Sequence, residues 1–123
     1  MKLTKNFSKH EFDSKDGAEM PLEVLQNIKK LAENLQVLRD ELKAPITINS
    51  GYRSQKHNAK IGGANKSQHL LGNASDIVVE GYTPQEVAVV IEELIRDGKM
   101  LQGGLSAYDT FTHYDIRGIK ARW

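Results

Sequence analysis

The most informative segment of this chain reads Ser67-Gln68-His69-Leu70-Leu71-Gly72-Asn73-Ala74-Ser75-Asp76. It closes a stretch, residues 62–75, that is rich in Gly, Asn and Ser and is predicted to form a loop. The apolar residues that follow predict a strand over Asp76–Val79. Gly72 permits a sharp turn, so the loop can fold back and bring the imidazole of His69 to the carboxylate of Asp76.

Secondary structure is predicted on both sides of this segment. A long helix is expected over about Pro21–Lys43, because apolar residues recur there at steps of three and four: Leu25, Ile28, Leu31, Leu35, Leu38 and Leu42. This stripe is interpreted as core. The other predicted elements are a helical turn with a capping box at Ser8–Glu11, a strand over Ile46–Ser50, a short helix near Ser54–Ile61, a helix from the N-cap Thr83 to about Asp97, and strands near Gly104–Tyr108 and Phe111–Ile116.

These elements predict an α+β fold, a small and mainly antiparallel sheet flanked by helices. The last two strands are separated only by Asp109-Thr110, which favours a tight hairpin. No repeat, low-complexity tract or Pro/Gly/Ser linker divides the sequence. We therefore expect residues 1–123 to form a single domain.

Composition excludes several classes of protein. The chain has no cysteine, so disulfide scaffolds, thiolate zinc fingers and cysteine nucleophiles are ruled out. Its 17 basic and 16 acidic side chains give a net charge of +1, which offers no reason to expect a nucleic-acid partner. No apolar run approaches the ~20 residues that span a bilayer. The segment Met1–Phe7 has a little positive charge, but no apolar stretch follows it. We therefore expect no secretory signal peptide and no membrane insertion.

Two of the four histidines stand beside carboxylates. His69 precedes Asp76 by seven residues, and His113 lies on the last predicted strand. Two imidazoles and one carboxylate, without thiolate, are the ligand set of a catalytic zinc site that leaves a position for water. Manganese or cobalt also suits this set. The alternative is an ordinary loop histidine, a strand-capping aspartate and a half-buried strand histidine. His57 is interpreted as a helix-to-loop contact and His10 as a solvated residue.

Three blocks of sequence carry a resemblance to a known family. They are Ser67-x-His69-x-x-Gly72-x-Ala74-x-Asp76, then Ser50-Gly51-Tyr52-Arg53-Ser54 with His57-Asn58 and Gly62-Gly63-Ala64, and finally Gly103-Gly104-Leu105 through Phe111-Thr112-His113-Tyr114-Asp115-Ile116-Arg117. Together they resemble the zinc D-Ala-D-Ala metallopeptidases. That group includes D-alanyl-D-alanine carboxypeptidases, D,D-dipeptidases and the L-alanyl-D-glutamate endolysins of phages, and the hedgehog domain shares its fold. The chain is most similar to short, single-domain phage members.

The resemblance implies roles for individual residues. It makes His69, Asp76 and His113 zinc ligands. It also matches Arg53 to the arginine that polarises the scissile carbonyl, which is reasonable because a guanidinium stabilises a developing oxyanion. Ser67 and Tyr52 are expected either to orient ligands or substrate or to be structural.

The chain departs from the family at the general base. Members usually place an acid or histidine two or three positions before the last ligand, where this chain has Phe111 and Thr110. Asp115 is our first candidate for the base because it shares a strand face with His113. Asp109 is the second candidate. Asp115 has an alternative role, to hold a ligand imidazole by its far N–H.

The expected function follows from this resemblance. It implies a zinc peptidase that hydrolyses an amide bond in peptidoglycan stem peptides, next to a D-amino acid. A basic stretch free of acidic residues between Glu41 and Asp76 favours an anionic substrate. We expect a monomer that is made in the cytoplasm and acts on the wall after release, as an endolysin does. The alternatives are a D,D-carboxypeptidase or dipeptidase acting on small precursors, and a zinc-stabilised binding domain without turnover.

Overall fold

The fold is built on a five-stranded sheet. The computed structural model describes all 123 residues. Strands run in the spatial order β1 (Ile46–Ser50), β2 (Ala74–Val79), β4 (Thr112–Asp115), β3 (Gly104–Ala107) and β5 (Ala121–Arg122). Every pairing is antiparallel except that of β3 with β5. The predicted α+β class with a mainly antiparallel sheet is therefore confirmed.

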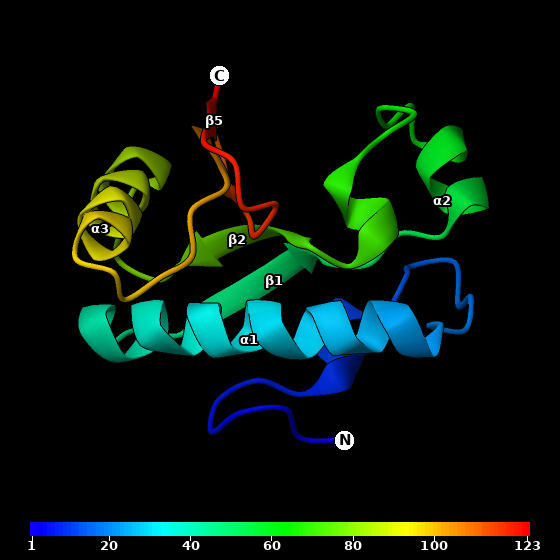
Figure 1. Ribbon diagram of the computed structural model, residues 1–123, viewed down its shortest axis with the longest axis horizontal. Helices are drawn as coiled ribbons and strands as arrows, with labels where there is room; N and C mark the ends of the chain where they lie inside the picture. The colour runs from blue at the N-terminus through cyan, green and yellow to red at the C-terminus, as the bar shows by residue number, and fades with distance from the viewer.

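The long helix α1 (Leu22–Leu42) supplies one side of the core and lies across β1 and β2 in Figure 1. Its predicted apolar stripe is buried except for the partly buried Leu25, and Leu31, Leu35 and Leu38 are fully excluded from solvent. The second amphipathic helix, α3 (Pro84–Arg96), begins at the predicted Thr83 cap, where Glu86 completes a capping box. No helix is both long and apolar enough to cross a membrane.

Alternation along β2 separates the two faces of the sheet. Ile77 and Val79 belong to the hydrophobic core, so Asp76 points to the opposite face. Tyr114 on β4 is likewise in the core, and His113 alternates with it. Asp76 and His113 are direct register partners on these two neighbouring strands. The sheet itself thus brings two of the predicted ligands together.

The segment before β2 differs from its prediction. Residues 62–75 were expected to be loop throughout, but they contain the 3-10 turn η2 (Gln68–Leu71), and β2 begins at Ala74. The turn is short and capped by the Ser67 side chain, so it lacks the length that makes periodicity visible. Strand β5 was not predicted either, because a two-residue strand has no alternation to detect. The remaining elements are η1 (Lys9–Phe12) and α2 (Gln55–Lys60), both near their predicted positions.

Candidate metal centre

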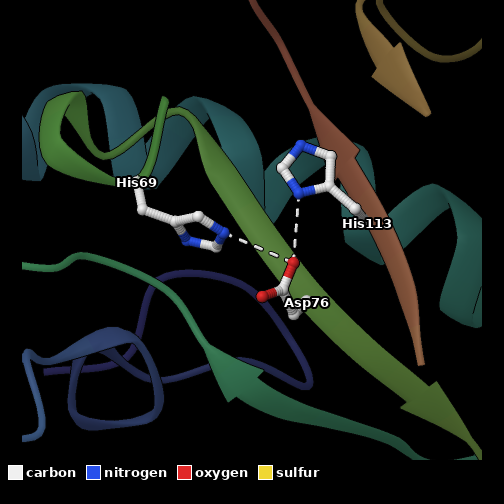
Figure 2. A group of neighbouring side chains, drawn as sticks. All are labelled: His69, Asp76 and His113. Carbon is white, nitrogen blue, oxygen red and sulfur yellow. Dashed lines mark hydrogen bonds and ion pairs between the residues drawn. The ribbon is translucent and has the colours of Figure 1, made fainter. Parts of the chain in front are cut away.

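Three side chains from different elements converge: His69 from the turn η2, Asp76 from β2 and His113 from β4. Figure 2 shows the imidazoles of His69 and His113 both pointing at the carboxylate of Asp76. The Oδ1 atom of Asp76 lies 3.3 Å from Nε2 of His69 and 3.1 Å from Nδ1 of His113. One ligand atom from each residue falls within 4.8 Å of the others. The three predicted ligands therefore form a single cluster of the size that a metal ion requires.

Each imidazole is oriented by a contact at the ring nitrogen that does not face Asp76. Nδ1 of His69 lies 2.7 Å from the carbonyl oxygen of Gly51, and Nε2 of His113 lies 2.7 Å from Oδ2 of Asp115. A ligand histidine characteristically donates its far N–H to a carbonyl or carboxylate, which selects the tautomer with the near nitrogen free. This arrangement fits a zinc site of two imidazoles and one carboxylate.

The electrostatics of the cluster favour a positive charge within it. Burial opposes ionisation of Asp76, but hydrogen bonds from His113 and His69 outweigh it and lower its pKa below the usual range. Burial also disfavours the imidazolium of His113, yet the adjacent Asp115 and Asp76 raise its pKa. A divalent cation supplies the positive charge that these carboxylates favour.

Local sequence positions His69 for this role. The Ser67 hydroxyl accepts a hydrogen bond from the His69 amide at 3.2 Å and so begins the turn η2. Gly72 ends it with φ of +77°, a conformation that favours glycine. An added Cβ at Gly72 would also collide with Val24 of α1. The expected turn at Gly72 is confirmed.

Arg53 adjoins the carboxylate ligand. Its Nη2 donates to Oδ2 of Asp76 at 3.2 Å, and its backbone N–H donates to the carbonyl of His69 at 3.0 Å. Ser50 and Asn58 accept from Nε and Nη1. The structure thus places Arg53 at the metal cluster, as the resemblance implied, rather than in a solvated surface pair.

Asp115 lies behind His113 and does not face the cluster. Its carboxylate is fully buried and accepts hydrogen bonds from His113, from the Gly104 amide and from both the amide and the guanidinium of Arg117. It does share the strand face of His113, as expected. Because its oxygens already accept these hydrogen bonds, this geometry does not favour a proton acceptor beside the metal, a role that stays a prediction. It fits the alternative role of orienting His113.

The other predicted residues lie as follows. Asp109 is exposed at the hairpin turn and lines a different hollow with Thr110 and Pro84, and it belongs to neither the ligand group nor the lining of the cleft over it. Tyr52 is buried in the core, and His57 lies on α2 outside the ligand group. Ser67 caps η2 and also lines the cleft described next.

A cleft of about 520 Å³ opens over the three ligands. Its lining residues come mainly from two segments, residues 64–69 and residues 108–123, together with Arg53 and Asp76. Trp123 was not singled out from the sequence, yet its ring lies 5.0 Å from the His113 ring and its indole N–H donates to Tyr108. Arg122 anchors this end of the chain by donating to Glu92 at 2.7 and 2.8 Å. Apart from Asp76, no carboxylate lines the cleft.

Sequence reasoning also missed a cluster that supports Arg53. Asp16 accepts hydrogen bonds from the hydroxyls of Ser54 at 2.6 Å and Ser14 at 2.7 Å, and Ser14 in turn accepts from the Ser54 amide. These contacts tie the residue after Arg53 to the N-terminal segment. No local pattern reveals them, because Asp16 and Ser54 are 38 positions apart.

Replacing Asp16 by asparagine is expected to destabilise the fold in a pH-dependent way. Hydrogen bonds from Ser54 and Ser14 lower the pKa of Asp16 below its ordinary value of 3.8. The charged group therefore stabilises the fold above about that pH, and the effect is lost as the pH falls toward the folded-state pKa. Urea unfolding should show a difference between parent and D16N at pH 6 that shrinks at pH 3. D13N, which removes a partly exposed ion pair with Lys9, is the control. If the difference in the free energy of unfolding between parent and D16N does not vary with pH, the assignment of a lowered pKa to Asp16 is wrong.

Comparisons with known proteins agree with this geometry. A family model described as peptidase M15 matches residues 3–115. The chain is 43% identical over 44 residues to a zinc D-Ala-D-Ala carboxypeptidase of Streptomyces albus G, a match that spans 35% of this chain and 17% of that protein. Its fold is similar to that of the L-Ala D-Glu endopeptidase ChiX of Serratia marcescens. The TM-score is 0.50 and the identity 18%, over 79% of this chain and 88% of that one.

Proposed function

We propose that this chain, which belongs to the peptidase M15 family, is a zinc-dependent peptidase that hydrolyses an amide bond in peptidoglycan stem peptides. The observation that carries the proposal is the cluster of His69, Asp76 and His113 on the floor of an open cleft, with Arg53 beside it. The carboxypeptidase activity of the Streptomyces relative supports the choice of metal and reaction.

The residues at the cleft would have different roles in such a reaction. His69, Asp76 and His113 would hold the zinc, which when bound supplies a Lewis acid that activates water and polarises a carbonyl. Arg53 has two guanidinium N–H groups that are not used in its three hydrogen bonds. Those groups can donate to the oxygen that becomes negative as the amide carbon turns tetrahedral. Asp115 holds the imidazole of His113 in the required orientation.

Mass spectrometry of digested peptidoglycan tests the proposal. Purified fragments are incubated with the zinc-loaded protein, with and without a chelator. A new product that the chelator abolishes is expected, and its mass distinguishes cleavage between L-Ala and D-Glu from cleavage between two D-Ala residues. No product from several wall types, with protein shown to contain zinc, would overturn the proposal.

Removal of the metal is expected to lower Tm by about 10 °C or more. A ligand bound only by the folded state at a thousandfold excess over its Kd adds about 4 kcal/mol to the free energy of unfolding. The check is a thermal scan with and without chelator, using H69A as a variant whose Tm the chelator should not move. An unchanged parental Tm after zinc has been shown to leave would contradict the prediction.

One observation favours a second candidate, a zinc-stabilised domain that binds peptidoglycan or protein without turnover. Asp109 is not among the residues that line the cleft, and the carboxylate oxygens of Asp115 are already hydrogen-bonded, so neither candidate base offers a free carboxylate there. The digestion experiment decides between the two functions, because a binding domain has no activity for the chelator to abolish.

The finer parts of the expected function remain predictions. They are a phage or prophage endolysin, action on the wall after release from the cytoplasm, and a monomeric state. Sedimentation of the purified protein checks the monomeric state. Lysis of intact sacculi, compared with trimming of soluble precursors, separates an endolysin from a D,D-carboxypeptidase or dipeptidase.

A further inference from the structure

The side chains that line the cleft over the ligands include more cations than carboxylates. They include the cations Arg53, Lys66 and Arg117 but a single carboxylate, Asp76. That carboxylate belongs to the metal cluster, so a bound divalent cation would more than neutralise it. A cleft lined mainly by one sign of charge attracts ligands of the other sign.

The three cations differ in how they are already engaged. The guanidinium of Arg53 pairs with Asp76 at 3.2 Å, and that of Arg117 pairs with the buried Asp115 at 2.8 Å. Both arginines therefore hold carboxylates that position the metal site. Lys66 is exposed and has no acidic partner among the ion pairs of the structure. It is the one cation lining the cleft whose charge is not already paired with a carboxylate, so its full charge can act on a substrate carboxylate.

The backbone at Lys66 is held in place close to the cluster. The next residue, Ser67, donates its amide hydrogen to the carbonyl of Ala64 at 3.1 Å and caps the turn that carries His69. The aromatic side chains of Tyr108, Phe111 and Trp123 line the cleft from the C-terminal segment. Figure 1 shows residues 61–68, in green, and the C-terminal residues, in red, rising apart from each other beside β2. Lys66 and these aromatic side chains therefore line the same cleft as the three ligands, where a peptide bound at the metal would lie.

We propose that Lys66 is a specificity-determining residue that binds a free carboxylate of the substrate near the scissile amide. The inference rests on the proposed function and narrows its substrate class to acidic stem peptides whose carboxylate is not amidated. Because the contact is made to a group that does not react, it should lower KM more than it raises kcat.

Paired synthetic peptides test this proposal. The substrate is the stem pentapeptide L-Ala-γ-D-Glu-L-Lys-D-Ala-D-Ala, used free, amidated at the α-carboxylate of D-Glu, or amidated at its C-terminus. The parent protein, K66A and K60A are compared at equal zinc content. Lys60 is the matched control because it is an exposed lysine of α2 that does not line the cleft.

The parent and K60A are expected to prefer the free peptide over one of its amides by about tenfold to a hundredfold in KM, the effect of losing one charged hydrogen bond. The amide that is disfavoured identifies which carboxylate is bound. K66A should cleave all three peptides with similar KM. Equal preference in K66A and parent, or no preference in the parent, would overturn the inference while leaving the peptidase intact. Cleavage of none of the peptides by the zinc-loaded parent would instead refute the proposed function.

Discussion

Arg53→Ala is expected to reduce kcat by about 10²–10³-fold while zinc remains bound, the usual loss when one donor to a developing oxyanion is removed. The guanidinium lies beside the carboxylate ligand Asp76 and keeps two N–H groups that its three hydrogen bonds do not use. It should therefore act mainly in the transition state, so that KM changes less than kcat. The measurement is steady-state kinetics on a cleaved stem peptide, with zinc content determined by atomic spectroscopy.

Two further variants make this experiment decisive. R53K keeps the charge but not the planar fork of donors, and it should recover only part of the rate. R96A removes an arginine that is 71% exposed on α3 and should behave as the parent. If R53A instead loses its zinc in proportion to its activity, Arg53 serves mainly to hold Asp76, and its assignment to the carbonyl is wrong.

Asp115→Asn is expected to weaken zinc binding by about 10–100-fold, the usual effect of removing a carboxylate that orients a ligand histidine. The asparagine amide cannot accept from His113 and Arg117 as both carboxylate oxygens now do. Zinc affinity is measured by competition with a chromophoric chelator. Activity is then measured at saturating zinc, where most of it should return.

The two acids named as candidate bases are distinguished by the same assay. D109N should bind zinc and turn over as the parent does, because Asp109 is exposed and does not line the cleft. If D115N keeps its zinc affinity but stays inactive when fully loaded, Asp115 is a proton acceptor and not a positioning residue. If D109N alone is inactive, neither assignment survives.

Several features of this protein are determined by residues a few positions apart. The stripe from Leu25 to Leu42 predicts helix α1, and the Thr83 cap with Glu86 predicts where α3 begins. Such signals are local, because they depend on the helical repeat and on side chains that bond to their own backbone. The approach of His69 to Asp76 is also expected from the sequence, because Gly72 allows the turn between them. That His113 completes the ligand set was implied only by the resemblance to the zinc metallopeptidases.

The tertiary structure alone decided how the site is supported. The strand repeat correctly placed Asp115 on the face of His113, but it could not show which nitrogen of the imidazole that carboxylate would meet. That outcome depends in part on Gly104, whose amide meets the Asp115 carboxylate only once β3 and β4 pair. Asp16 reaches Ser54 and Trp123 reaches His113 for the same reason. Contacts between distant segments depend on how the elements pack, and no short-range pattern encodes that packing.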